Sequence, residues 1–496
     1  MTYAKLYSRS SCSGNPAPVT IEVHLSPGLP KFSIVGLAET ATKESKDRVR
    51  SAIISSNLQF PNKRITINLA PADLPKRGSH YDLAIAIGIL IASAQLSCNN
   101  LEMYEFFGEL GLQGEIKTIP VGLALAQAAN KSGRTPVSAT ENCYKISRIL
   151  QLESIPVINL GDICAHLSGT KKIEYIKAST ARFDRDNHQH ISIESIIDQN
   201  QAKIAAALAA AGGHSALLTG PPGVGKSMLA KTMPGLMPTL TKQEIIELAI
   251  LQELDNQSSY NYGSRPFRSP HHTISSAALV GGGNPPEPGE ITYAHNGILF
   301  LDELAEFSRA TINCLRQPLE DGYVNISRSS YKTRFPASFQ LIATTNPCPC
   351  GYHKIAGSNC KCSENAIQSY NAKLSGPILD RIDLFVKMHK IDTKKLIRTN
   401  PEKTKTVFTK QDIDQAYKKQ IARQGIQNAK ISSSDINKYC NFSTSTENFL
   451  YEITNNIQIS ARSYHRILKV ARTIADLHNS DIIEKEHITE ALTFRP

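Results

Sequence analysis

The feature that most constrains this 496-residue chain is a glycine-rich loop set between an apolar strand and a helix. Residues 220–227 read GPPGVGKS, which fits the pattern of a glycine, four residues and then Gly-Lys-Ser or Gly-Lys-Thr. Residues 215–219 have the pattern of a short buried strand, and residues 227–232 begin a helix. Successive backbone N–H groups and the positive end of the helix then point at one place, where a polyphosphate can bind. The alternative is a glycine turn that fits by chance, and the flanking strand and helix argue against it.

The loop predicts how a nucleoside triphosphate and its magnesium ion would be held. Lys226 would reach the outer phosphates, and the Ser227 hydroxyl would bind Mg²⁺. Backbone contacts to the phosphates are expected over the whole loop and the start of the helix. The residues of this expected binding loop are Gly220, Pro221, Pro222, Gly223, Val224, Gly225, Lys226, Ser227 and Met228.

The second half of a nucleotide-hydrolysing site is expected further along the chain. Residues 297–301 form an apolar strand that ends in Asp302 and Glu303. Asp302 would hold Mg²⁺ through water, and Glu303 would polarise the attacking water. A strand with a polar end is common in any protein, but the position of this one after the phosphate loop favours the catalytic interpretation. A third apolar strand, residues 339–345, ends in the amide of Asn346.

Size, charge and cysteine usage limit the class of protein. The length predicts about three domains. No apolar run approaches the roughly 18 residues of a membrane helix, and the first residues lack the apolar segment of a signal peptide. A cytoplasmic protein without membrane contact is therefore expected, with its ten cysteines as thiols or metal ligands. The net charge of +11 suits a polyanionic partner, nucleic acid first, although many basic proteins bind none.

The first third of the chain has the pattern of a mixed α/β domain. Alternating strands are expected at residues 19–25 and 64–69, and helices at residues 44–57 and 81–93. Residues 114–133 predict a turn, a short strand and an alanine-rich helix.

Three stretches of this first third resemble a known family. Residues 28–36 (GLPKFSIVG), 68–74 (NLAPADL) and 82–90 (DLAIAIGIL) are similar to the N-terminal domain of the magnesium chelatase-like YifB/ComM family of AAA+ ATPases. The resemblance covers nearly the whole chain and implies four segments. They are a domain with the fold of the Lon proteolytic domain (1–170), a linker (171–195), an AAA+ α/β core with a parallel sheet (196–392) and a helical lid (393–496).

The resemblance implies that the Lon-like domain is an inactive protease fold. Lon chemistry needs a serine nucleophile and an activating lysine. The serine of Lon follows a Pro-Lys-x-Gly-x pattern, and this chain has His80 at that place, with Ser79 one position away. Ala124 stands where the lysine is expected. Lys117 and Lys131 could in principle form a new pair with Ser79, but solvated side chains are the expected state.

Further roles follow from the resemblance to AAA+ proteins. Asn346 is expected to orient the water at the γ-phosphate. Arg381, within LSGPILDRID, is expected to be an arginine finger that reaches the γ-phosphate of a neighbouring subunit. That role requires a ring, most often of six subunits. Arg462 is expected to be the second sensor, with Arg466 one turn further along the same helix as the reserve candidate.

Two insertions carry the expected DNA contacts. Residues 265–289 resemble the helix-2 insertion of the chelatase and MCM branch, and residues 322–335 resemble its pre-sensor hairpin, which in helicases projects into the pore. The alternative is a solvated hairpin tip, and His271 with His272 could be metal ligands by type, although a loop role is preferred. Cations on a moving surface suit phosphate contacts. The expected DNA-binding residues are Arg268, His271, Arg328, Lys332 and Arg334.

Four cysteines follow Asn346 as a Cys-x-Cys, nine residues and a second Cys-x-Cys. We call Cys348, Cys350, Cys360 and Cys362 the cysteine cluster. Four thiolates can close a tetrahedral Zn²⁺ site, although the usual spacing within each pair is two residues. Prolines and glycines around the cluster leave little core to hold this loop without a metal. Reduced cysteines without metal, or a disulfide, are the alternatives.

The family resemblance implies an ATP-hydrolysing, ring-shaped DNA helicase that promotes branch migration in homologous recombination during natural transformation. Its expected cofactors are ATP, Mg²⁺ and Zn²⁺, and its partners are single-stranded, duplex or branched DNA and further copies of itself in a homo-hexamer. One rival is a chelatase-type motor that remodels a protein partner. The other is a Lon-like ATP-dependent protease, which needs the serine and lysine pair. A non-enzymatic nucleotide switch fits less well, because Glu303, Asn346 and Arg381 form a complete hydrolytic set.

Overall fold

The computed structural model describes residues 2–10, 16–36, 42, 44–179, 191–255, 263–328, 331–354, 359–374, 376–390, 408–457 and 460–496. The chain divides into two compact units. The first unit is made of Met1–Asp184, Lys242–Tyr262 and Ser327–Arg334, and the second of Arg185–Thr241, Gly263–Ile326 and Phe335–Pro496. The predicted mixed α/β fold with parallel sheets is confirmed.

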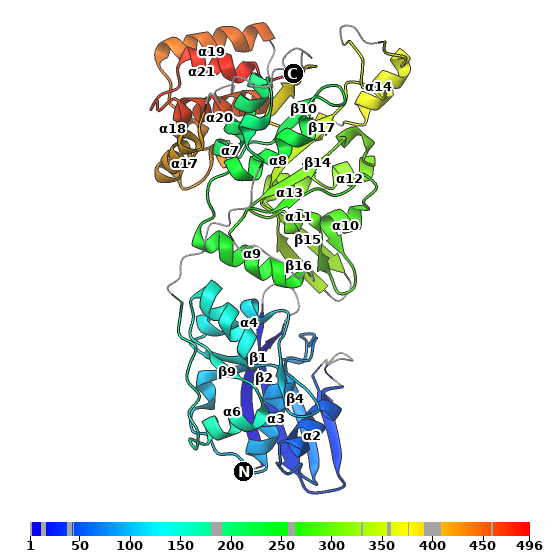
Figure 1. Cartoon of the computed structure of the whole chain (residues 1–496), viewed down its shortest axis with the longest axis vertical. Helices are drawn as coiled ribbons and strands as arrows, with labels where there is room; N and C mark the ends of the chain where they lie inside the picture. Colours follow the sequence, from blue (N-terminus) through cyan, green and yellow to red (C-terminus); the bar gives the residue numbers. More distant parts are fainter. Residues whose placement is uncertain are drawn as a thin grey trace. The chain divides into compact units, whose positions relative to one another are not determined.

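The first unit is built on a four-stranded sheet. In sheet order its strands are β1 (Tyr3–Ser10), β2 (Ala17–Ser26), β4 (Arg64–Ala70) and β3 (Lys31–Val35). β3 pairs with β4 in parallel and the other pairs are antiparallel. The helix α3 (Asp82–Ala92) is buried along its whole length against β1 and β2, with α2 (Ser45–Ser55) beside it (Figure 1). The predicted apolar helix is therefore the centre of this core.

A smaller parallel sheet completes the first unit. Its strands are β5 (Tyr104–Phe107), β8 (Thr135–Ala139) and β9 (Ile155–Val157). A short hairpin pairs β6 (Glu109–Leu110) with β7 (Ile116–Lys117). The remaining elements are η1 (Leu101–Met103), α4 (Gly122–Lys131), α5 (Thr140–Lys145), η2 (Ile146–Leu150) and α6 (Leu160–Leu167). Residues 171–179 of the predicted linker are irregular, with Ile176 bridging to Ser154, and residues 180–190 lie outside the described residues.

The helix α9 (Lys242–Leu254) also groups with the first unit, although it follows the phosphate-loop helix in sequence. Ile246 and Ala249 of α9 share an apolar cluster with Leu123 and Ala126 of α4. The Glu253 carboxylate accepts a hydrogen bond from the Leu123 backbone N–H at 2.9 Å, at the start of α4. Burial raises the pKa of Glu253 to about 8 against these backbone hydrogen bonds. Nothing in the local sequence of α9 indicated this partner.

The second unit contains a five-stranded parallel sheet. In sheet order its strands are β11 (Phe267–Arg268), β14 (Ile298–Leu301), β17 (Gln340–Thr345), β10 (Ala216–Thr219) and β18 (Leu384–Lys387). β14 and β17 are buried at every position, as expected where helices cover both faces of a parallel sheet. The helices α7 (Asn200–Gly212) and α8 (Lys226–Leu236) pack beside it (Figure 1).

The remaining elements of the core precede these strands, lie between them or follow them. They are η3 (Ile193–Ser195), α10 (Ser276–Val280), β12 (Gly281–Gly282), β13 (Glu287–Pro288), α11 (Glu290–Tyr293), η4 (Leu304–Glu306), α12 (Arg309–Asn313), α13 (Arg316–Asp321), α14 (Glu364–Ala372) and α15 (Gly376–Leu379). The strands β15 (Tyr323–Arg328) and β16 (Tyr331–Pro336) pair with each other as the predicted hairpin.

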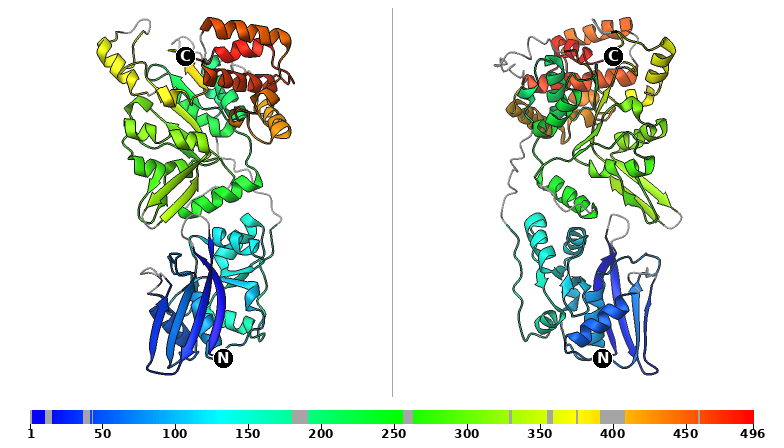
Figure 2. Two further views of the ribbon diagram at one scale, coloured as in Figure 1. Left: turned by 180° about the vertical axis from the view of Figure 1, so that it is seen from behind. Right: turned by 45° about the vertical axis from the view of Figure 1, so that its right-hand side comes forward.

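The chain ends in a helical bundle within the second unit. Its members are α17 (Lys410–Gln424), η5 (Asn428–Lys430), α18 (Ile436–Tyr439), α19 (Thr444–Ile457), α20 (Ala461–Leu477) and α21 (Lys485–Leu492). Both views of Figure 2 show these orange and red helices gathered together. The buried face of α20 packs on α17 and α21. Residues 391–407, which include the start of the predicted lid (393–496), lie outside the described residues. No helix in the described part of the chain is long and apolar enough to cross a bilayer.

Candidate functional site

The phosphate loop joins β10 to α8 in the second unit. Gly223 and Gly225 have φ angles of +79° and +91°, in the left-handed region that favours glycine. A Cβ added at either position would meet no atom within 4 Å, so the backbone conformation rather than space requires glycine there. The helix α8 begins directly at Lys226. The loop therefore has the conformation and the following helix that phosphate binding needs.

The Lys226 ammonium lies at the centre of the site. Its side chain is buried, and Nζ donates hydrogen bonds to the carbonyl oxygens of Gly220 at 2.5 Å and Pro221 at 2.9 Å. A third hydrogen bond joins Nζ to Asn346 Oδ1 at 2.9 Å. Burial lowers the pKa of Lys226, while the charge of Asp302 acts in the opposite direction. The two ends of the predicted site are therefore in direct contact.

The Asp302 carboxylate, directly after β14, lies beside the Ser227 hydroxyl in the first turn of α8. The Ser227 hydroxyl lies 3.0 Å from Asp302 Oδ2 and 3.2 Å from Oδ1. A hydroxyl and a carboxylate form the oxygen donor set that Mg²⁺ prefers. Because β10, β14 and β17 are parallel, their carboxyl ends bring Ser227, Asp302 and Asn346 to one edge of the sheet.

Thr344 is a site residue that sequence reasoning missed. Its hydroxyl donates to Asp302 Oδ1 at 2.5 Å and accepts from the Glu303 backbone N–H at 2.9 Å. Glu303 has a φ of +54°, an uncommon conformation for a residue with a side chain, and such strain clusters at functional sites. The sequence signal was a pair of threonines at the end of a buried strand, directly before Asn346.

The predicted arginine finger is held by its own chain. The Arg381 guanidinium donates to the Pro377 carbonyl oxygen at 2.6 Å and forms an ion pair with Glu320. Its side chain is only 12% exposed. A role toward a neighbouring subunit would require Arg381 to leave Glu320, so the finger stays a prediction.

The two candidate sensor arginines differ in their partners. Arg466 forms an ion pair with Asp383, whose other oxygen lies 3.1 Å from His214 Nδ1. Burial opposes ionisation, but His214 and Arg466 hold the pKa of Asp383 at about 2. Arg462 is exposed in the first turn of α20 and has no side-chain hydrogen bond or ion pair within the described ranges. Arg462 is thus better placed for a ligand than Arg466.

The hairpin separates an apolar side from a cationic side. Val324, Ile326 and Phe335 belong to a buried cluster. Arg328, Lys332 and Arg334 are exposed, which fits the alternation of a strand pair. The predicted tip, Ser329 and Ser330, lies outside the described residues.

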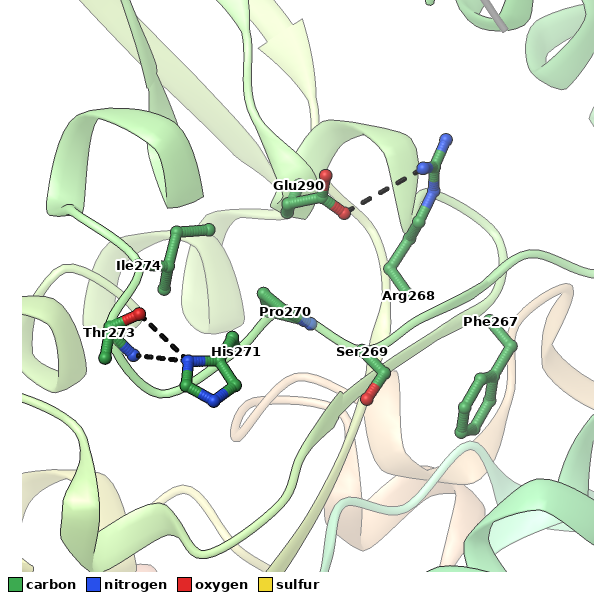
Figure 3. Close-up of a pocket in the computed structure, with 8 residues that line it drawn as sticks. All are labelled: Phe267, Arg268, Ser269, Pro270, His271, Thr273, Ile274 and Glu290. Atoms are coloured by element: carbon green, nitrogen blue, oxygen red, sulfur yellow. Dashed lines mark hydrogen bonds and ion pairs between the residues drawn. The ribbon is translucent and has the colours of Figure 1, made fainter. Parts of the chain in front are cut away.

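The predicted contacts in the helix-2 insertion line a surface pocket of about 510 Å³ (Figure 3). Arg268 lies 4.0 Å from Glu290 and 4.9 Å from the ring centre of Tyr293. His271 Nδ1 lies 2.9 Å from the Thr273 hydroxyl. Glu290 brings negative charge into this pocket, so the pocket is less suited to phosphate than the hairpin.

The cysteine cluster forms one group of thiols. All four sulfur atoms lie within 4.8 Å of one another, and Cys348 is buried. The Sγ–Sγ distances are 3.3 Å for Cys348–Cys350, 3.8 Å for Cys348–Cys360 and 3.5 Å for Cys350–Cys360. Hydrogen bonds from the Tyr352 backbone and from Cys348 lower the pKa of Cys350 to about 6. This geometry can hold a metal ion, and the described cysteines are free thiols. No comparable His, Cys, Asp or Glu group occurs elsewhere in the described ranges, including at His271 and His272.

Three family models and two full-length relatives match this chain. The family model described as magnesium chelatase, subunit ChlI, matches residues 192–396. A second model of that subunit matches residues 21–142, and its C-terminal model matches residues 402–495. The chain is 42% identical over 502 residues to the uncharacterized protein YifB of Salmonella typhimurium, covering 100% of this chain and 97% of YifB. It is 42% identical over 501 residues to the competence protein ComM of Haemophilus influenzae, covering 100% and 98%.

The chain belongs to the YifB/ComM family of magnesium chelatase-related AAA+ proteins. Membership of this family implies the use of ATP and Mg²⁺. The chain is also 27% identical to Lon protease 2 of Bacillus subtilis over 183 residues, which covers 32% of this chain and 33% of that protease. The family resemblance and the Lon-like fold expected from the sequence are therefore confirmed.

In the Lon-like domain of this YifB/ComM member, Ser79 and His80 make contacts that differ from those of a serine nucleophile. His80 is buried, its Nε2 lies 2.8 Å from the Arg9 carbonyl oxygen, and burial lowers its pKa to about 4. The Ser79 hydroxyl donates to the Glu109 carboxylate. Lys117 and Lys131 are exposed, and neither contacts Ser79 within the described residues. Within the described residues, Ser79 is therefore paired with a carboxylate and not with the lysine that Lon chemistry uses.

Proposed function

We propose that this protein is an ATP-hydrolysing, ring-forming DNA motor that promotes branch migration in homologous recombination during natural transformation. The observation that carries the proposal is the meeting of Lys226, Asp302 and Asn346 at the carboxyl edge of one parallel sheet. A relative named competence protein ComM, aligned over 100% of this chain, supports the link to competence.

The chain's own groups have distinct roles in the proposed turnover. Lys226 exchanges the loop carbonyls for phosphate oxygens, and Ser227 with Asp302 provides oxygen ligands for Mg²⁺. When bound, Mg²⁺ neutralises charge on the phosphates. Glu303 accepts the proton of the attacking water, and Asn346 orients that water beside the γ-phosphate.

Two arginines link the proposed site to assembly. Arg381 leaves Glu320 and places its cation on the γ-phosphate bound by a neighbouring copy. Arg462 provides a second cation from the helical lid. A site completed in this way is competent only within a closed ring, for which we propose six copies.

Cations outside the nucleotide site support DNA as the partner. Arg328, Lys332 and Arg334 are exposed on the hairpin, and Arg268 and His271 extend the proposed surface. The net charge of +11 has the sign that a phosphate backbone requires. The cysteine cluster is proposed to bind Zn²⁺ as a structural metal, because its sulfur spacing fits a tetrahedral site.

A chelatase-type motor is the second candidate, because the matching family models carry that name. It would apply the same ATP turnover to a protein partner and gives no role to the hairpin cations. An ATP-dependent protease is disfavoured by the contacts of Ser79 and His80.

A four-way junction assay tests the proposal. Full-length protein with ATP and Mg²⁺ should convert a mobile junction into duplex products, and a Lys332→Ala/Arg334→Ala variant should lose conversion while retaining basal ATP turnover. Lys485→Ala, on the surface of the helical lid, is the matched control for removing a cation. ATP turnover without any movement of junctions or forks would favour the chelatase-type motor.

A further inference from the structure

The loop that carries the cysteine cluster begins inside the nucleotide site. Asn346, which contacts Lys226, stands two residues before Cys348. The Gly220 backbone N–H at the start of the phosphate loop donates to the Thr345 carbonyl oxygen at 3.3 Å. The position of the first cysteine is thus tied to both halves of the site.

The same loop also touches the phosphate loop directly. Gly351 has a φ of +83°, and a Cβ added there would lie 2.5 Å from Pro222 Cδ and 2.9 Å from Pro222 Cγ. Only a residue without a side chain allows this approach. Gly351 follows Cys350, and its backbone N–H donates to the Cys348 carbonyl oxygen at 2.9 Å. The contact with Pro222 therefore comes from the turn that the first two cysteines form.

The turn has little regular structure around it. Within the described part of residues 347–362 there is no helix or strand, and only Cys348 and Gly351 are buried. A tetrahedral Zn²⁺ site with Zn–S bonds of about 2.3 Å separates its sulfurs by about 3.8 Å. The spacings among Cys348, Cys350 and Cys360 are 3.3–3.8 Å, and all four sulfurs, including that of Cys362, lie within 4.8 Å of one another. The His353 backbone N–H also donates to Cys348 Sγ at 3.3 Å, the type of second contact that orients a metal ligand.

We propose that Zn²⁺ bound by the cysteine cluster clamps this turn against the phosphate loop, so that the metal positions Pro222 and Asn346 for ATP turnover. The inference rests on the proposed ATP turnover and is independent of DNA. It assigns the metal a positioning role at the nucleotide site rather than a role confined to folding of a surface loop.

The clamp predicts two separable effects when the metal is lost. Release of Pro222 loosens the phosphate loop and raises the KM for ATP. Displacement of Asn346 leaves the attacking water poorly oriented and lowers kcat. Mutation of the groups that support metal ligands typically changes activity by about 10–100-fold, so losses of at least that size are expected when the metal itself is removed.

The first experiment compares metal content with ATP turnover in full-length protein. Elemental mass spectrometry should find one zinc ion per chain in the wild-type protein. Cys360→Ser should lose zinc and lower kcat/KM by about 10–100-fold. Cys360→His, which restores a zinc ligand, should recover both zinc and turnover. Cys314→Ser, a cysteine outside the cluster, is the control that should change neither.

The second experiment breaks the contact but keeps the thiols. Gly351→Ala should retain zinc while raising the KM for ATP, because the new methyl group pushes Pro222 away. Gly425→Ala is the matched control, since Gly425 has a φ of +75° and open space around it. This control carries the same backbone strain without a clash.

Three outcomes overturn the clamp. The wild-type protein could turn over ATP without containing zinc, or Cys360→Ser could lose zinc and keep full ATP turnover. Gly351→Ala could also retain zinc and show an unchanged KM for ATP. If Gly351→Ala also loses zinc, Cys360→His decides, and failure of regained zinc to restore turnover contradicts the clamp. If wild type with zinc has no ATP turnover, the proposed function fails instead. The two failures are therefore distinguishable.

Discussion

Two turns of this molecule each lead into a helix, and they differ in how their buried polar side chains are paired. The phosphate loop leads into α8, and residues 75–81 lead into α3. At the first turn Lys226, Asp302 and Asn346 point toward one another. At the second turn His80 contacts a backbone carbonyl and Ser79 contacts Glu109. The two turns therefore both lead into a helix, but their polar side chains have different hydrogen-bond partners.

The difference lies in how each buried polar group is satisfied. His80 is buried with a pKa lowered to about 4, so it is a neutral hydrogen-bonding group at neutral pH. Asp82 at the start of α3 is buried and paired with Arg48, 2.6 Å away. Lys226 is buried too, but its partners are neutral oxygens that a phosphate can replace. Exchangeable partners, rather than burial alone, distinguish the candidate nucleotide site from the turn at residues 75–81.

The largest expected effect is that of Lys226→Ala. It removes the only cation that contacts both the loop carbonyls and Asn346 within the described residues. Nucleotide binding and ATP turnover should both fall below detection, as measured by a coupled ATPase assay and by fluorescent nucleotide binding. Turnover near the wild-type rate would place the active site elsewhere.

Glu303→Gln should separate binding from chemistry. The amide keeps the shape but cannot accept the proton of water, so kcat should fall by about 10²–10⁴-fold with nucleotide affinity retained. Glu306→Gln, three residues further along, is the matched control. Equal losses in both variants would argue against a specific base.

Thr344→Val tests the residue that links Asp302 to Glu303. Loss of the Thr344 hydroxyl removes its hydrogen bonds to the Asp302 carboxylate and to the Glu303 backbone N–H. We expect kcat to fall, or the Mg²⁺ concentration needed for half-maximal turnover to rise, by about 10-fold. Thr292→Val, at a buried hydroxyl that has no hydrogen-bond partner among the described residues, should leave turnover unchanged. A Thr344→Val enzyme indistinguishable from wild type would make that hydroxyl structural only.

The attachment of α9 should depend on pH. The pKa of Glu253 is about 8 in the folded state, above its ordinary value of 4.5, so the folded protein keeps a proton that the unfolded chain releases. The free energy of unfolding therefore falls as the pH rises from the ordinary pKa of 4.5 to the folded-state pKa of about 8. From pH 7 to 8 the loss is about 1 kcal/mol, or roughly 2–4 °C in the thermal midpoint. Scanning calorimetry of wild type and Glu253→Gln checks this, and an equal pH response in both would contradict it.

The smallest expected effect is that of Ser79→Ala in the Lon-like domain. ATP turnover should not change, and stability should fall by about 1 kcal/mol for the lost hydrogen bond. Wild type should not hydrolyse casein. Casein hydrolysis that disappears in Ser79→Ala would restore the protease interpretation.

The sequence was sufficient for features with a local signal. The strand before the phosphate loop and the apolar strands before Asp302 and Asn346 are present where their patterns predicted them.

Features that depend on distant partners could not be predicted. Thr344 acquires its role only because β14 and β17 are neighbours. The Arg381–Glu320 pair joins residues far apart in the sequence, as does the contact of Gly351 with Pro222. The helix α9 has apolar residues suited to many surfaces, and its place against α4 follows from complementary shape and from Glu253.

The most direct test of the central claim is ATP turnover by the full-length protein, titrated in parallel with single-stranded, duplex and four-way DNA. We predict that turnover rises with DNA, that the four-way structure is among the activators, and that Lys226→Ala has no turnover under any condition. Turnover that is the same with and without every DNA would contradict the account of this protein as a DNA motor.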